Sequence, residues 1–162
     1  MPPPHGPPGG PPLHSCLPRN WPEQQALLER QHLRLARQIE QLLQEHTTPA
    51  HDPDQATGER QRSACWRMLQ SVRLHLRLEE CWLSHHGALS PQHRRAHREA
   101  VLLAMAALHR SGSDRACRLE VLLTLRDWHQ SHGLSTDALA YAQIQHGHGH
   151  QPGPQSRPPQ RE

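Results

Sequence analysis

The sequence predicts an all-α protein, an antiparallel bundle of four to five helices between two low-complexity ends. Apolar residues in the middle of the chain recur at spacings of three and four, which is the period of one helix face. Proline and glycine are sparse there and cut this stretch into helix-sized pieces. No segment combines apolar–polar alternation with β-branched residues, so we expect no strands.

The first helix is predicted over residues 20–45. Asn20 is a favourable N-cap, Pro22 suits the first turn, and Glu23 completes a capping pattern. A narrow stripe then follows at alternating spacings of four and three: Leu28, His32, Leu35, Ile39, Leu42 and His46. Such a stripe is also typical of a coiled-coil seam that meets a partner.

The second helix is predicted over residues 59–84 and is apolar on two sides. One side carries Cys65, Met68, Leu69, Val72 and Leu76, and the other carries Leu74, Leu78, Cys81 and Trp82. A helix of this kind is usually central and touches two neighbours.

Three further helices complete the prediction. Ser90 and Pro91 form an N-cap and a first helical position, and they open a helix over residues 91–110. Ser113 or Asp114 caps a fourth helix, which we expect to stop at Gly133. Ser135 then caps a short fifth helix. Short connectors between helices favour antiparallel neighbours.

The two ends of the chain differ from its middle. Nine of the 16 prolines lie in residues 1–22, and residues 146–162 are rich in histidine, proline and glutamine. Such segments bury too little apolar surface to offset their ordering entropy. We therefore predict a Pro-rich disordered segment over residues 1–19, one bundle domain over residues 20–145, and a disordered tail over residues 146–162.

The composition and the N-terminus limit which modifications and which cellular location we expect, but they say little about an activity. All 18 basic Lys/Arg positions are arginine, so no lysine side chain can carry ubiquitin or acetyl groups. The N-terminus lacks the basic and apolar regions of a secretory signal, and no apolar run is long enough to span a membrane. We expect a cytoplasmic or nuclear protein with free thiols.

Histidines offer a candidate metal site, because the chain has 16 of them. Cys81 and His85 lie one helical turn apart, as do His93 and His97. If the two helices form a hairpin across Gly87, these pairs could converge on a tetrahedral zinc site. The alternative is that these are solvated histidines near a turn. The run His146, His148 and His150 is a second, looser candidate for metal binding.

A basic cluster offers a candidate nucleic-acid surface. Arg94, Arg95 and Arg98 lie at the start of the third helix, and arginine is well suited to phosphate recognition. A helix N-terminus disfavours cations, however, and the chain has few aromatic residues for base stacking. A solvated helix face is the alternative.

The leading function prediction is a non-enzymatic protein–protein interaction protein, an adaptor or regulatory subunit. Enzyme signatures such as GxGxxG, GxSxG and HExxH are absent, so we expect no enzyme and no cofactor. The candidate contact to another protein lies on the first helix: Trp21, Leu28, Leu35, Ile39 and Leu42. Two alternatives remain open, an arginine-dependent nucleic-acid-binding protein and a helical cytokine-like secreted factor.

Overall fold

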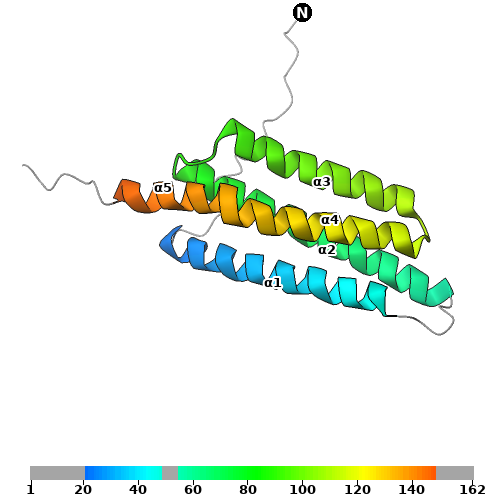
Figure 1. The fold of residues 1–162 in the computed structure, drawn as a ribbon. Coiled ribbons are helices and arrows are strands. Elements are labelled where there is room, and N and C mark those ends of the chain that lie inside the picture. The colour runs from blue at the N-terminus through cyan, green and yellow to red at the C-terminus, as the bar shows by residue number, and fades with distance from the viewer. Residues whose placement is uncertain (1–20, 49–54, 149–162) are drawn as a thin grey trace, which may run out of the picture.

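The computed structural model describes residues 21–48 and 55–148, and this part of the chain is helical with no strand. Its elements are α1 (Trp21–Thr47), α2 (Gln55–His85), α3 (Pro91–Ser111), α4 (Arg115–His132), the π-helical turn η2 (Gly133–Asp137) and α5 (Ala138–His148). The predicted all-α antiparallel bundle is confirmed (Figure 1). The segment 1–19, predicted to be disordered, and most of the tail lie outside the described residues.

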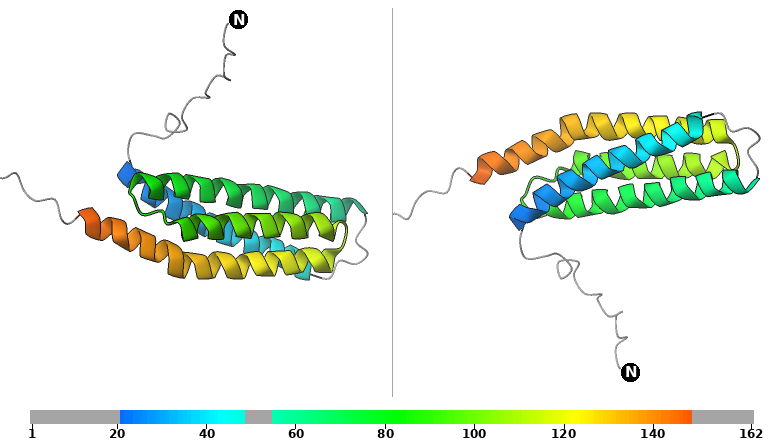
Figure 2. Two further views of the ribbon diagram at one scale, coloured as in Figure 1. Left: turned by 90° about the horizontal axis from the view of Figure 1, so that it is seen from above. Right: turned by 90° about the horizontal axis from the view of Figure 1, so that it is seen from below.

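The four long helices run up and down as a four-helix bundle (Figure 2). α1 packs against α2 and α4, while α3 packs against the same two helices from the other side. α1 ends and α2 begins at the end of the bundle where α3 connects to α4. The α2–α3 connection lies at the opposite end, where α4 also passes through η2 into α5.

The N-terminal caps predicted for α3 and α4 are formed. The hydroxyl of Ser90 accepts a hydrogen bond from the backbone N–H of His93 at 3.0 Å. Asp114 caps α4 by accepting from the N–H of Cys117 at 3.1 Å. Because Ser90 fixes where α3 begins, it also fixes which residues of the first turns face the core.

The prediction that the fourth helix stops at Gly133 is wrong. Gly133 has helical angles (φ −59°, ψ −41°), and the chain continues through η2 into α5, so Ser135 does not cap a separate helix. The glycine serves close packing instead of helix termination. A Cβ atom at residue 133 would lie 2.7 Å from Nε2 of His32, which is closer than real contacts allow.

The core consists of two apolar clusters with a polar layer between them. The larger cluster is built around Leu35, Ile39, Leu69 and Leu122. The smaller one, toward the α2–α3 connection, contains Leu28, Trp82, Leu83, Ala140 and Ile144. None of the helices in the described ranges combines the length and apolar character that crossing a membrane requires.

Candidate metal centre

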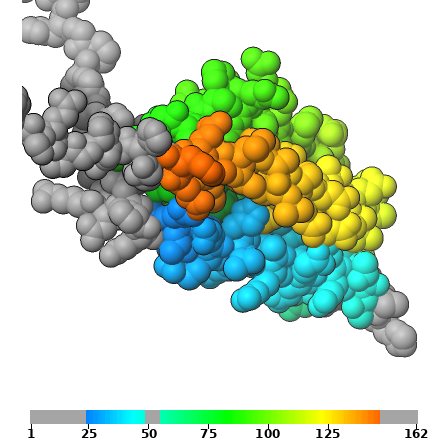
Figure 3. All heavy atoms as spheres, turned by 60° about the vertical axis from the view of Figure 1, so that its left-hand side comes forward, coloured from blue at the N-terminus to red at the C-terminus, as the bar shows by residue number. Residues whose placement is uncertain are grey.

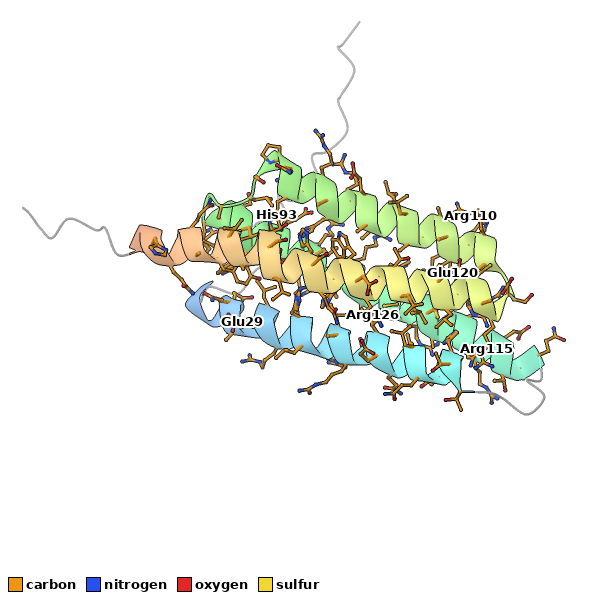
Figure 4. All side chains as sticks on the ribbon, viewed as in Figure 1. Glu29, His93, Arg110, Arg115, Glu120 and Arg126 are labelled. Carbon is orange, nitrogen blue, oxygen red and sulfur yellow. The ribbon has the colours of Figure 1, made fainter. Side chains whose placement is uncertain are left out.

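The polar layer is formed because each long helix places polar side chains where its core-facing stripe passes the same level of the bundle. These side chains alternate with apolar core positions at helical spacing. We call the whole set the polar layer; its members are His32 of α1, His75 and Glu79 of α2, His93 and His97 of α3, and His129, His132 and Asp137 of α4 and η2. Figure 4 places His93 on the side of α3 that faces α4.

Four members of this layer converge on one point. One ligand atom from each of His93, His97, His132 and Asp137 lies within 4.8 Å of all the others, and all four residues are buried. The Nε2 atoms are separated by 3.0 Å (His93 to His97), 2.9 Å (His97 to His132) and 3.3 Å (His132 to His93). Metal–nitrogen bonds of about 2.0–2.1 Å place neighbouring ligand atoms roughly 3 Å apart. The spacing therefore matches a set of metal ligands.

Hydrogen bonds among the three nitrogens cannot match every pair of this triangle. A neutral imidazole Nε2 is either a donor or an acceptor, so among three nitrogens in mutual contact at least one pair has the same role. Two donors or two lone pairs at about 3 Å repel each other in a buried site. A cation at the centre removes the conflict, because it accepts all three lone pairs at once.

The carboxylate of Asp137 closes the group. Its Oδ1 lies 3.1 Å from Nε2 of His93 and 3.1 Å from Nε2 of His132. Burial alone would raise the pKa of Asp137, but the two imidazoles outweigh it and hold that pKa well below its usual range. Asp137 is therefore ionised, and it gives the site a negative charge that suits a metal cation.

The imidazole of His97 is held in the form that binds metals. Burial, followed by the neighbouring His93 and His132, lowers the pKa of His97 to about 3, so the ring is neutral. Its Nδ1 lies 3.1 Å from Oε1 of Glu80. Donation from Nδ1–H to this carboxylate leaves the lone pair on Nε2, facing the other histidines. A carboxylate behind a ligating histidine is a recurrent feature of metal sites.

The π-helical turn explains how His132 and Asp137 can act together. In a regular α-helix, residues five apart differ by about 140° around the axis and face different neighbours. A π turn widens the helix locally, so that His132 and Asp137 face the same interior point. Such turns occur frequently at functional sites.

A second group of donors lies beside the first. Glu79 is 0% exposed, and its Oε2 lies 3.7 Å from Nε2 of His97. The hydroxyl of Tyr141 donates to its other oxygen, Oε1. Burial, and then the nearby Asp137, raises the pKa of Glu79 to about 7. Oε2 has no hydrogen-bond partner, so a buried carboxylate oxygen faces the centre of the bundle unsatisfied.

His75 repeats the arrangement of His97. Its Nδ1 lies 3.2 Å from Oε1 of Gln31, whereas its Nε2 is buried and has no hydrogen-bond partner. Burial and then His32 lower the pKa of His75 to about 4, so this ring is neutral too. Its free Nε2 lone pair is therefore available to a ligand.

His32 and His129 complete the layer on the α1 side. Their rings are stacked, with centroids 3.9 Å apart and planes 24° apart. The ring of His32 also meets that of His75 edge-on, with centroids 5.7 Å apart. Gly133 makes this possible, because the absent side chain is the space that His32 fills.

A groove of about 640 Å³ at the surface reaches His32 and His129 on this side of the layer. It lies between α1 and the segment formed by α4, η2 and α5, which run side by side on the face shown in Figure 3. Its lining includes His32, His129, Gly133, Asp137 and Tyr141. The polar layer is thus closed along the bundle axis by apolar clusters and open on one side.

The structure brings together half of the predicted zinc set. His93 and His97 meet as expected, but His132 and Asp137 complete the group, and Cys81 and His85 do not belong to it. Cys81 is half-buried and His85 is exposed at the end of α2. The hairpin across Gly87 forms, yet these two residues lie on other sides of α2 than Glu79. Of the predicted tail site, His146 is exposed, and His150 lies outside the described residues.

The other predicted site residues lie away from the polar layer or inside the bundle. Arg94, Arg95 and Arg98 are exposed on α3. Four of the five residues predicted to meet a partner are buried within the bundle: Leu28, Leu35, Ile39 and Leu42. The fifth, Trp21, begins α1, but its side chain lies outside the described part of the chain.

Sequence reasoning missed most of the layer, although a signal was present. His75 and Glu79 follow Met68 and Val72 at helical spacing, on the stripe that packs into the core. His129 and His132 continue the stripe of α4 in the same way. In each helix, polar residues take positions on the face that otherwise carries apolar core residues. When these positions lie at the same height along an antiparallel bundle, they indicate one shared site.

Comparison with known proteins finds no matching family model, no similar curated protein and no similar solved structure. The chemistry of the site is therefore inferred from its own geometry.

Proposed function

We propose that this chain is a metalloprotein whose four-helix bundle holds a dinuclear non-haem iron centre that binds a small ligand. The observation that carries the proposal is the triangle of Nε2 atoms of His93, His97 and His132, at 2.9–3.3 Å from one another, beside an ionised Asp137. Without a cation, this arrangement buries mismatched lone pairs or donors. With one, it is a ligand set of ordinary dimensions.

The second group of donors supports a second metal beside the first. His75 and Glu79 each keep a buried, unpartnered ligand atom, and the ring of His32 meets that of His75 edge-on. Buried polar atoms without partners are costly, and a cation would satisfy them. Glu79 lies between the two groups, since it is near His97 on one side and on the same helix as His75 on the other. Together with Asp137 it is suited to bridging two metals.

The donor set favours iron. Histidine and carboxylate side chains that project inward from the four helices of a bundle are the usual ligands of di-iron and di-manganese centres. A set with this many imidazoles is richer in nitrogen than manganese prefers, and it contains no thiolate of the kind that structural zinc sites favour. The group that contains His93 would by itself suit a single zinc ion, which is the second candidate.

The two metal positions differ in the number of nitrogen ligands, and this difference supports binding of a small ligand. The first position has three histidines, whereas the second has His32 and His75 as its clearest nitrogen donors. Both share the carboxylates of Asp137 and Glu79. The second position therefore has fewer protein ligands, and it is the one that the groove beside His32 reaches. A small neutral or anionic molecule such as dioxygen or azide fits such a place.

Anaerobic loading of the full chain with ferrous iron, followed by desalting and metal analysis, tests the proposal. We expect two iron ions per chain in the wild type and a loss of iron in the double variant His93→Ala/His97→Ala. His109→Ala is the matched control, because His109 is exposed on the same helix. A wild type that retains no more iron than the double variant would refute the proposal. One tightly held zinc and no iron would favour the second candidate.

The tail needs its own control, because histidine runs bind metals loosely. Replacing His146, His148 and His150 with glutamine should leave the iron content of the desalted protein unchanged. Iron that disappears in this variant but not in the α3 double variant would assign the metal to the tail.

The interaction function inferred from the sequence stays a prediction, as do its nucleic-acid-binding and secreted-factor alternatives. The burial of Leu28, Leu35, Ile39 and Leu42 gives these side chains a role in the bundle core, so a partner would need another surface. A metal centre is compatible with a regulatory subunit that responds to oxygen, redox state or metal supply.

A further inference from the structure

A polar pocket of about 470 Å³ lies at the end of the bundle where α2 and α4 begin. Three arginines line it, Arg62 from α2 and Arg115 and Arg118 from α4. Glu59 is the only acid among the described residues of the lining, which therefore carries an excess of two positive charges. A pocket of this volume is in the range that small molecules occupy.

Arg118 is the unusual member of this lining, because it is only 1% exposed. A guanidinium group stays charged in a protein, and a buried charge is costly unless a counter-charge accompanies it. Its acceptors are all uncharged: the backbone oxygen of Gly112 at 3.1 Å, Nε2 of His46 at 3.4 Å and Oε1 of Gln61 at 3.5 Å. In the ranges 21–48 and 55–148, no carboxylate forms an ion pair with it. An anion in the pocket would supply the missing charge.

Part of the role of these arginines is to bind the last carbonyls of neighbouring helices. Arg118 donates from Nη1 to the oxygen of Gly112, which follows α3, and Arg115 donates from Nε to the oxygen of His46 on α1 at 2.8 Å. Nη2 of Arg115 bonds two further carbonyls at the end of α1. Nη1 of Arg115 takes no part in these contacts. The guanidinium groups are therefore held in place with N–H donors left for a ligand.

The helices around the pocket also favour an anion. α2 begins at Gln55 and α4 at Arg115, so the positive ends of two helix dipoles lie at this end of the bundle. Neither helix has an acidic residue in its first turn. The cap of α4, Asp114, accepts hydrogen bonds from the backbone N–H of Cys117 at 3.1 Å and from its thiol at 3.3 Å. The carboxylate of the cap is thus engaged with its own helix.

We propose that this pocket binds the phosphoryl group of a small phosphorylated molecule. The planar fork of arginine matches the oxygen atoms of a phosphate. A phosphate monoester carries about two negative charges at pH 7, which balances the excess positive charge of the lining, whereas one carboxylate balances half of it. The inference goes beyond the proposed metal centre and does not depend on it, because no member of the polar layer lines this pocket.

Isothermal titration calorimetry of the chelator-treated full chain with inorganic phosphate tests the proposal. Chelation removes any iron to which phosphate could bind. Glycerol 3-phosphate and acetate are titrated for comparison. We expect one inorganic phosphate per chain, an affinity for glycerol 3-phosphate at least as high, and a Kd for acetate that is higher by about tenfold or more.

Two variants assign the binding to the pocket. Arg62→Ala should raise the Kd for phosphate by about tenfold and leave the fold unchanged, because Arg62 is exposed. Arg73→Ala, at an exposed position farther along α2, is the matched control and should bind like the wild type. Arg118→Met should abolish detectable binding, with circular dichroism to check that the chain is still helical. If Arg118→Met does not fold, the comparison of Arg62→Ala with Arg73→Ala decides.

Four results would overturn the inference. The first two are a wild type that binds no phosphate and an Arg62→Ala protein that binds it with wild-type affinity. The third is phosphate that binds only after Asp52 and Asp54 are replaced by asparagine, since the chain's own acids would then neutralise the arginines. The fourth is binding to vesicles that contain phosphatidic acid without binding of either soluble phosphate, which would assign the pocket to a lipid surface. None of these results bears on the iron content of the chain, so the two proposals fail independently.

Discussion

The three Nε2 nitrogens of His93, His97 and His132 lie together in the bundle core and are the centre of the proposed metal site. Each side chain is 2–6% exposed, so water does not separate them. Their mutual distances are those of ligand atoms around one ion, and the three nitrogens cannot all be matched as donor–acceptor pairs among themselves. Single side chains that hydrogen-bond to these histidines then determine how firmly the rings are oriented.

Glu80 is such a residue, because it accepts a hydrogen bond from Nδ1 of His97 at 3.1 Å. We predict that Glu80→Ala lowers metal affinity by about 10–100-fold, since the ring of His97 loses its orientation and some basicity. Competition with a chromophoric chelator measures the change. Glu99→Ala, at an exposed position of α3, is the control. An affinity of Glu80→Ala equal to that of the control would contradict the role of this carboxylate.

Tyr141 tests the buried carboxylate of Glu79. The phenol hydroxyl donates to Oε1 of Glu79, which has no contact with solvent. We predict that Tyr141→Phe lowers the free energy of unfolding of the metal-free protein by about 1–3 kcal/mol, because it leaves a buried acceptor without its donor. Urea unfolding followed by circular dichroism measures this. An unchanged midpoint would mean that the contact contributes nothing.

At the scale of the elements, the π turn η2 and its first residue arrange the ligands of two helices. η2 turns Asp137 toward the point that His132 faces, and Gly133 lets α1 approach until His32 reaches the layer. The core stripes and most helix bounds could be predicted, because apolar spacing and caps depend on local sequence. The continuity of α4 through Gly133 could not, because a glycine after a helix is locally the usual sign of its end, whereas here it packs against His32, a residue distant in sequence.

Gly133→Ala tests this arrangement. A methyl group at residue 133 would lie 2.7 Å from Nε2 of His32, so this ring must move. We predict a loss of about 1–3 kcal/mol in the free energy of unfolding, as is typical of overpacking, and a lower content of the second metal. Gly58→Ala is the control, because nothing lies within 4 Å of a Cβ built there. Full metal content in Gly133→Ala would show that His32 is not a ligand.

At the scale of the whole molecule, the bundle places a polar layer between two apolar clusters and leaves one side open to a groove. The fold class and two of the proposed ligands, His93 and His97, could be predicted from the sequence, because these histidines lie one turn apart on one helix. Sequence reasoning paired them with Cys81 and His85, which are nearby in sequence. His132 and Asp137 could be found only by placing α4 and η2 against α3, since the convergence of these elements is a property of packing.

The cost of burying so many imidazoles predicts a pH dependence for the metal-free protein. Burial lowers the pKa of His75 and His129 to about 4 and that of His97 to about 3. As the pH falls below about 6.5, these histidines therefore become protonated in the unfolded chain before they do so in the folded chain. The free energy of unfolding decreases over this range as a result. Glu79, whose pKa is raised to about 7, raises the free energy of unfolding as the pH falls, but it is one group against three histidines.

Urea unfolding of the chelator-treated full chain measures this dependence. We expect a lower midpoint at about pH 5 than at about pH 7.5, because the histidines are protonated in the unfolded state only. An equal or higher midpoint at the acidic pH would contradict the burial of neutral imidazoles in the metal-free protein.

A pair of metal ions in the polar layer would be located by anomalous X-ray scattering from a crystal of the iron-loaded protein. We predict two anomalous peaks in the bundle core, about 3.5–4 Å apart as in other two-metal sites. One peak should lie among His93, His97 and His132, and the other beside His75 and His32. A well-ordered bundle with no anomalous peak at either position would show that the polar layer holds no metal pair.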